Sequence, residues 1–111
     1  MSNKILKTFK VSGVSFCKET INQLKEGDIL NMELEPTNKY DSNAIKILNN
    51  DNEMCGYIPK KSKIGNEEIM LNVNIKNKFD KMLDRYHLVV SNIHKWDGPT
   101  GLEVSFVKKS S

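Results

Sequence analysis

The sequence predicts a mainly β fold of the α+β class: a small six-stranded antiparallel barrel with two helical segments. Six short runs are rich in β-branched or alternating apolar residues, and clusters of Gly, Pro, Asn and Asp separate most of them. The chain has 111 residues, which is enough for one modest core. Because an open sheet of six short strands would leave two exposed edges, closure into a barrel is favoured. We expect residues 1–111 to form a single domain.

The strands are predicted by alternation and by their turns. In residues 29–35, apolar and polar residues alternate before Pro36 ends the run. The β-branched run 44–48 and the run 53–58 flank an Asn/Asp-rich turn at 49–52, which predicts a hairpin. The remaining strands are expected at residues 5–11, 87–93 and 102–106.

Two segments have helical spacing. Residues 18–25 place Ile21 and Leu24 three apart and close on Gly27, which predicts a short helix with a glycine stop. A second pattern covers residues 67–83, and two short helices or one helix with a frayed start both fit it. Its apolar positions are Ile75, Phe79, Met82 and Leu83.

The charge of the chain is mildly basic. Lysine and arginine number 17 against 14 acidic residues, a formal net charge of +3, and Arg85 is the only arginine. A nucleic acid would therefore be held through its backbone and by stacking rather than by arginine contacts to base edges. No secretory signal or membrane-spanning apolar run is present. We thus expect a cytoplasmic monomer, associated with the nucleoid when it binds DNA, with no membrane partner and with Cys17 and Cys55 as reduced thiols.

The motifs of catalysis and metal binding are missing from the sequence. The soft metal-ligand candidates are Cys17, Cys55, His87 and His94, and no two of them stand at the spacing of a zinc site. There is no nucleophile elbow, phosphate loop or dinucleotide-binding pattern. The sequence therefore predicts a protein that is not an enzyme and that carries no metal or cofactor.

The most informative segment is the loop between the second and third predicted strands. It places Tyr40, a flat aromatic ring, beside Asp41, a carboxylate that only accepts hydrogen bonds when ionised. Two interpretations are open. The pair binds a ligand, or Asp41 caps the turn through neighbouring N–H groups while Tyr40 covers the end of the barrel.

Four motifs, in this order along the chain, resemble the HIRAN domain. They are FKVSGVSF at 9–16, LKEGD at 24–28, EPTNKYDSNAIKI at 35–47 and GYIP at 56–59. The resemblance covers nearly the whole chain and is densest between Gly27 and Pro59. It implies a modified OB-like barrel that binds single-stranded DNA and captures a free 3′-hydroxyl end. The family occurs in DNA-repair translocases and as free-standing proteins of bacteria and phages, so it implies a role in DNA repair or at replication forks.

The resemblance also implies roles for individual residues. Tyr40 would stack on the terminal base, Asp41 would accept a hydrogen bond from the 3′-hydroxyl, and Asn38 would shape the loop. Phe16 is the nearest equivalent of a second stacking aromatic, and Trp96 is a candidate for a third. Better-studied members carry an arginine at the position of Ser15 and a proline at that of Lys39. We expect four lysines to follow the DNA backbone: Lys39, Lys46, Lys60 and Lys61.

Two other functions remain as alternatives. A free-standing copy has no attached ATPase, so it could be a protein-interaction or targeting module that recruits a helicase or repair protein without binding DNA itself. The weaker alternative is a hydrolase or zinc-binding role of the kind found in larger proteins that carry HIRAN domains. A partner that survives nuclease treatment would favour the first alternative, and metal analysis would test the zinc part of the second.

Overall fold

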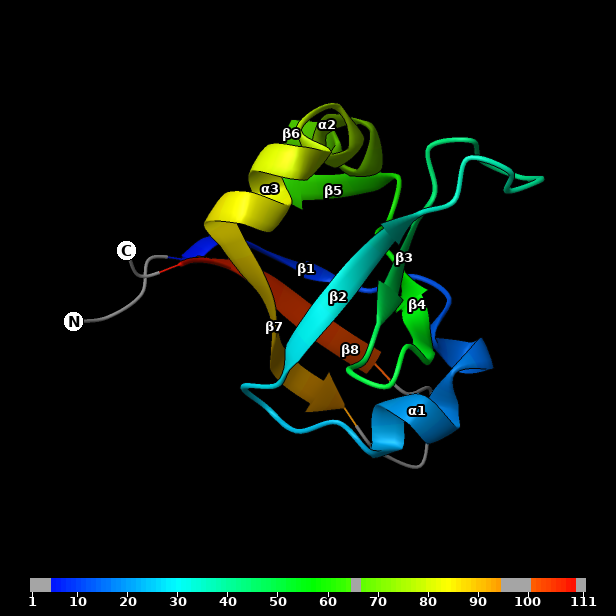
Figure 1. Cartoon of the computed structure of the whole chain (residues 1–111), viewed down its shortest axis with the longest axis vertical. Coiled ribbons are helices and arrows are strands. Elements are labelled where there is room, and N and C mark those ends of the chain that lie inside the picture. Colours follow the sequence, from blue (N-terminus) through cyan, green and yellow to red (C-terminus); the bar gives the residue numbers. More distant parts are fainter. Residues whose placement is uncertain (1–4, 65–66, 95–100, 110–111) are drawn as a thin grey trace.

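The computed structural model describes residues 5–64, 67–94 and 101–109 (Figure 1). Within these ranges, eight strands and three α-helices follow one another, with a short 3₁₀ helix, η1, near the start. In chain order they are β1 (Ile5–Lys10), η1 (Val14–Phe16), α1 (Lys18–Asn22), β2 (Ile29–Leu34), β3 (Ile45–Leu48), β4 (Met54–Tyr57), β5 (Lys61–Ile64), β6 (Glu67–Met70), α2 (Leu71–Asn77), α3 (Phe79–Arg85), β7 (Tyr86–His94) and β8 (Gly101–Lys108). No helix in this part of the chain is long and apolar enough to cross a membrane.

Six of the strands form one antiparallel sheet in the order β1-β8-β7-β2-β3-β4. Its two outer strands meet at a single bridge. The N–H of Ser12 donates to the carbonyl oxygen of Tyr57 at 2.9 Å, and the N–H of Tyr57 donates to that of Ser12 at 2.8 Å. The bridge joins the chain just after β1 to the end of β4, so the sheet closes into the predicted barrel.

The core lies inside this barrel. Alternating residues of β8 point inward, and Leu102, Val104 and Phe106 are at most 1% exposed. The ring of Phe106 lies 5.7 Å from that of Phe9 in β1, centroid to centroid. Ile21 of α1 is also fully buried, so this short helix closes part of the barrel. Figure 1 shows α1 beside β4 and the pair α2 and α3 at the opposite end of the molecule.

The six predicted strands are those of the main sheet, and the predicted fold class is confirmed. The second helical segment is two short helices, α2 and α3. It begins later than predicted, because residues 67–70 form strand β6, which pairs with β5 in a separate two-stranded sheet. The first helix is shorter than predicted. It ends at Asn22, and Gly27, with a φ of 93°, lies in the turn before β2 rather than at the end of the helix.

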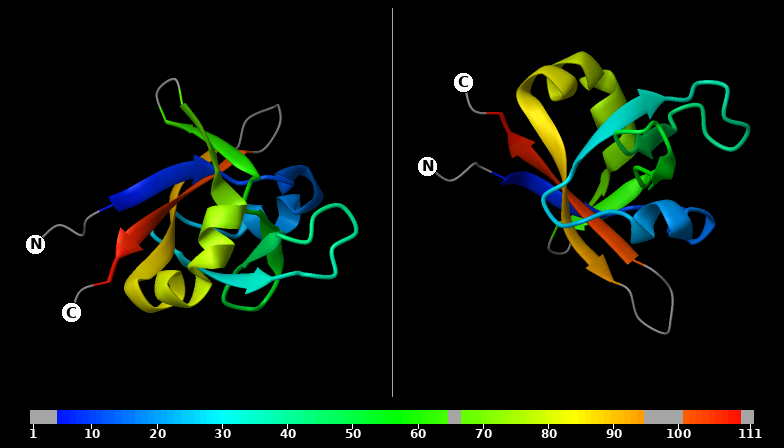
Figure 2. Two further views of the ribbon diagram at one scale, coloured as in Figure 1. Left: turned by 90° about the horizontal axis from the view of Figure 1, so that it is seen from above. Right: turned by 60° about the horizontal axis from the view of Figure 1, so that its bottom comes forward.

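The loop between β2 and β3 carries the predicted pair Tyr40 and Asp41. It leaves the barrel after Leu34 and returns at Ile45, and it projects beyond the body of the molecule in Figures 1 and 2. Its base is fixed by the N–H of Glu35, which donates to the carbonyl oxygen of Ala44 at 2.9 Å. The loop therefore extends the β2–β3 hairpin and holds its tip in a defined position.

Candidate nucleic-acid interface

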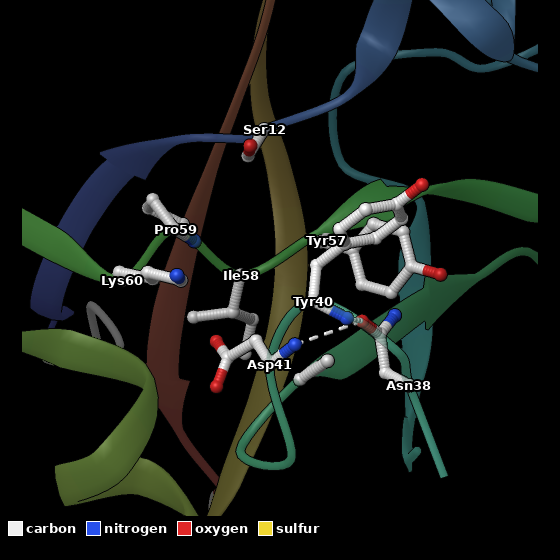
Figure 3. A pocket seen from close by; sticks show the side chains of 9 residues that line it. Ser12, Asn38, Tyr40, Asp41, Tyr57, Ile58, Pro59 and Lys60 are labelled. Carbon is white, nitrogen blue, oxygen red and sulfur yellow. Dashed lines mark hydrogen bonds between the residues drawn. The ribbon is translucent and has the colours of Figure 1, made fainter. Parts of the chain in front are cut away.

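An open pocket of about 230 Å³ lies where the β2–β3 loop meets the segment that follows β4. In Figure 3, Tyr40 and Tyr57 stand on one side of it, Pro59 and Lys60 on the other, and the carboxylate of Asp41 points toward the side of Lys60. The pocket is mixed in character, with aromatic, apolar and charged groups on its wall. Its lining residues are Ser12, Asn38, Tyr40, Asp41, Ala44, Tyr57, Ile58, Pro59 and Lys60.

Asn38 organises the tip of the loop. Its Oδ1 accepts two backbone hydrogen bonds, from the N–H of Tyr40 at 2.9 Å and from that of Asp41 at 3.0 Å. Its own N–H donates to the carbonyl oxygen of Glu35 at 3.1 Å. This is the turn chemistry that asparagine performs well, since its short side chain accepts from the backbone two and three residues ahead. The direction of the Tyr40 and Asp41 side chains is therefore set by the backbone of the turn.

Glu35 links the loop to the pocket wall. Its Oε1 accepts hydrogen bonds from Asn38 Nδ2 at 2.6 Å and from the hydroxyl of Tyr57 at 2.9 Å, and its Oε2 lies 3.2 Å from Lys46 Nζ. The hydrogen bond from Asn38, followed by that from Tyr57, lowers the pKa of Glu35. Desolvation, together with the hydrogen bond to Glu35, raises the pKa of Tyr57. Glu35 is thus an ionised acceptor that connects the end of β2 to Lys46 of β3 and to Tyr57 of β4.

Asp41 is held at both carboxylate oxygens. Oδ1 accepts from the N–H of Asn43 at 2.9 Å, which makes a local turn of the Asx type. Oδ2 accepts from Nδ2 of Asn72 in α2 at 2.7 Å. A carboxylate has about four acceptor sites, so each oxygen can accept a further hydrogen bond. Asp41 is half-buried, and its carboxylate can therefore still accept a bond from a hydroxyl group that enters the pocket.

The two predicted stacking residues differ in their position. Tyr40 is 90% exposed, so it does not cover the barrel end, and it lines the pocket. Phe16 is also 90% exposed, but it lies in η1 and is not part of the pocket wall. The start of η1 nevertheless lies close to the pocket wall, because a Cβ added to Gly13, the residue before η1, would be 3.6 Å from Cδ2 of Tyr57. The third predicted aromatic, Trp96, lies outside the described residues.

The predicted lysines are spread over different surroundings. Lys60 is exposed and lines the pocket, and Lys61 follows it as an exposed residue of β5. Lys39 is exposed at the tip of the loop, although it does not line the pocket. Lys46 is half-buried in β3, and its charge is paired with the carboxylate of Glu35.

Several residues that shape the pocket were not predicted as site residues. Ser12 and Tyr57 are brought there by the bridge that closes the barrel, and the only sequence signal for them was their place in the family motifs. Asn72 had no sequence signal at all. It is 2% exposed, lies 31 residues after Asp41, and belonged to a segment predicted only as amphipathic helix.

The two cysteines are free and buried. Burial raises the pKa of Cys55 to about 11 and also raises that of Cys17, so both are inert as nucleophiles near neutral pH. Within the described ranges, no group of three or more His, Cys, Asp or Glu residues is arranged to hold a metal ion.

The sequence matches the HIRAN domain family over residues 6–92. Among solved structures, a protein from Lactobacillus plantarum resembles this fold with a TM-score of 0.71 at 20% identity, over 96% of this chain and 95% of that one. The HIRAN domain of human HLTF resembles it with a TM-score of 0.60 at 18% identity, over 96% of this chain and 80% of that one. A comparison with curated protein sequences finds no match. At these identities the two structures establish the fold, while the family match rests on the sequence itself.

Proposed function

This chain belongs to the HIRAN domain family, and we propose that it binds the free 3′-hydroxyl end of single-stranded DNA in the pocket beside Tyr40 and Asp41. HIRAN domains are DNA-binding modules and not catalytic domains. The end specificity, the preference for single strands and a role in DNA repair or fork processing inside the cell are the parts that we propose. A helicase or repair protein would be the natural partner of such a module.

One observation carries the proposal: an exposed aromatic face and an immobilised carboxylate are adjacent in the same pocket. Tyr40 is 90% exposed, while Asp41 is fixed by Asn43 and Asn72. A base stacked on Tyr40 would gain about 1–3 kcal/mol with little sequence preference. Because the exposed ring contributes no core packing, binding a base is the function that best accounts for its position in the pocket.

The carboxylate supplies the selectivity for an end. An ionised Asp41 accepts a hydrogen bond from a hydroxyl group but repels a phosphate, so it disfavours both an internal nucleotide and a 3′-phosphate. Lys60 lines the same pocket and offers a cation for the phosphate that precedes the terminal nucleotide. The pocket therefore presents an acceptor for the terminal hydroxyl and a cation for the backbone.

The test is fluorescence anisotropy with a 5′-labelled single strand that ends in a 3′-hydroxyl, a 3′-phosphate or a 2′,3′-dideoxy nucleotide. We expect the hydroxyl end to bind about tenfold more tightly than either of the others, as befits one hydrogen bond to a charged group. In Asp41→Asn and Asp41→Ala this ratio should fall to near one. Asp51→Asn is the matched control, because Asp51 is exposed in the turn at the far end of β3 and β4.

Other outcomes would assign a different function. Equal binding to all three ends with a steep salt dependence would mean that lysines grip the backbone without end recognition. No binding to any strand would favour the protein-interaction alternative, and a pull-down after nuclease treatment would then be the next experiment. An Asp41→Ala variant that keeps the full preference for a hydroxyl would refute the proposed role of this residue.

A further inference from the structure

We infer that Asn72, a buried residue of α2, is the positioning residue that gives the Asp41 carboxylate its selectivity for a hydroxyl group. The inference rests on the proposed function and deepens it, since it places the control of end specificity on a helix outside the β2–β3 loop. Asn72 donates from Nδ2 to Oδ2 of Asp41 at 2.7 Å and is itself only 2% exposed.

The direction of this hydrogen bond matters. An ionised carboxylate cannot donate, so the amide NH₂ of Asn72 must face Asp41. One oxygen of Asp41 is already fixed by the N–H of Asn43, within the loop itself. The bond from Asn72 fixes the second oxygen and hence the plane of the carboxylate. A group held in this way loses little freedom when it accepts a ligand hydroxyl, which is the benefit of preorganisation.

The rest of α2 supports the same arrangement. The N–H of Leu71, its first residue, donates to the carbonyl oxygen of Lys60 in the pocket wall at 2.8 Å. Nζ of Lys76, one turn after Asn72, donates to the carbonyl oxygen of Ser42 and to Oδ1 of Asn43, each at 3.2 Å. The helix thus contacts the pocket wall through Leu71 and the Asp41 loop through Asn72 and Lys76.

These contacts also define the charges around Asp41. Among the described side chains, Lys60 supplies a cation in the pocket wall and Lys76 supplies one from α2 at the neighbouring Ser42 and Asn43, while Tyr40 and Tyr57 contribute neutral groups. Asn72 is the neutral donor between Asp41 and the helix. A change of charge at this one position therefore acts directly on the carboxylate.

The decisive variant is Asn72→Asp, which keeps the shape of the side chain. Two carboxyl groups at this distance cannot both ionise without strong repulsion, but a single shared proton restores a donor between them. At pH 8 we expect the preference for a 3′-hydroxyl over a 2′,3′-dideoxy end to fall about tenfold, and at pH 5 we expect it to return. The dideoxy end is the right comparison because, unlike a 3′-phosphate, it does not titrate in this range.

Asn74→Asp is the matched control, since Asn74 is exposed on the same helix and the variant adds the same charge. It should keep the wild-type preference at both pH values. Asn72→Ala should lose about threefold to tenfold of the preference at both pH values, and it keeps the inference falsifiable if Asn72→Asp does not fold. Thermal melting of each variant shows whether the domain remains folded.

The outcomes separate this inference from the function on which it rests. If wild type prefers the hydroxyl end and both Asn72 variants keep that preference at pH 8, Asn72 does not position Asp41, although the proposed function stands. If the wild type itself shows no preference, the proposed function fails and the inference fails with it. A loss of selectivity that does not depend on pH in folded Asn72→Asp would also overturn it, because a shared proton must reverse the effect.

Discussion

The closure of the barrel depends on one glycine, and Gly56→Ala is the change that tests it. Gly56 lies in β4 beside the bridge between Ser12 and Tyr57 and has a φ of 144°. A Cβ at this position would lie 2.5 Å from Cγ1 of Val11 and 2.6 Å from the carbonyl oxygen of Ser12. Both distances are far below van der Waals contact, and the second involves backbone. The chain just after β1, at Val11 and Ser12, can therefore approach β4 this closely only if residue 56 has no side chain.

Two costs add in this variant. A side chain at a φ that L-residues rarely adopt costs about 1–3 kcal/mol, and forcing a methyl group into a packed contact costs about 1–3 kcal/mol more. Relief of the clash would require the carbonyl of Ser12 to move, and this carbonyl accepts the 2.8 Å hydrogen bond from the N–H of Tyr57. We expect Gly56→Ala to lower the free energy of unfolding by about 2–6 kcal/mol in total. For a chain of this size, that is about 9–26 °C in melting temperature.

Thermal and urea denaturation of Gly56→Ala and Gly27→Ala measure the steric part separately. Gly27 also has a positive φ, 93°, but no described atom lies within 4 Å of the Cβ it would gain. The Gly27 variant should therefore lose only the conformational part, about 1–2 kcal/mol. An equal loss in the two variants would show that the close approach at Gly56 does not exist and that the barrel is open at this seam.

Three further predictions concern the site and the core. Tyr40→Ala should weaken single-strand binding by about 1–3 kcal/mol, measured by anisotropy. Its melting temperature should not change, because the ring is 90% exposed. A drop in melting temperature would mean that the ring packs on the barrel. Lys60→Met should reduce the slope of log affinity against log salt concentration by about 0.7. Lys46→Met should leave that slope unchanged, because Lys46 is paired with Glu35 at 3.2 Å. A smaller slope in Lys46→Met but not in Lys60→Met would show that Lys46, and not Lys60, contacts the phosphates. The pKa of Cys55 is raised to about 11 from 9.0, so the contribution of its neutral thiol to stability is complete below pH 9, and about 2 kcal/mol of stability should be lost between pH 9 and 11. Urea denaturation should show the free energy of unfolding falling steeply across this window in wild type and less steeply in Cys55→Ala. Some fall remains in the variant, because the burial-raised pKa values of Cys17 and Tyr57 act in the same direction.

The main sheet could be predicted because each of its strands has a local pattern. Strand β2 alternates buried Leu30 with exposed Asn31, and β8 buries Leu102 and Val104 on one face. A period of two is visible in four or five residues, with no knowledge of the partner strand. The order of the strands in the sheet depends on contacts between distant segments, but hairpins between successive strands and the need to cover strand edges restrict the possible orders.

The β5–β6 pair could not be predicted in the same way. Residues 67–70 precede α2 directly, and their sequence, Glu-Glu-Ile-Met, suits a helix as well as a strand. What decides the outcome is pairing with β5, from Lys61 opposite Met70 to Ile64 opposite Glu67. Such pairing is a tertiary effect, and propensity over four residues is too weak a signal to oppose it.

The candidate site, like the fold, is determined partly by local sequence and partly by contacts with distant residues. Asn38 and Asp41 stand three residues apart, and the turn that they form follows from asparagine and aspartate chemistry within the loop. The contacts that fix the plane of the carboxylate and the pocket wall come from Asn72 and from Tyr57, which lie 31 and 16 residues further along the chain. The loop sequence alone therefore determines the position of the carboxylate, but not the orientation on which the proposed selectivity for a hydroxyl end depends. If α2 and β4 supply that second property, the same loop on a barrel with a different helix would bind a strand by stacking and lose its preference for the hydroxyl end, because the aromatic face is local to the loop and the orientation of the acceptor is not.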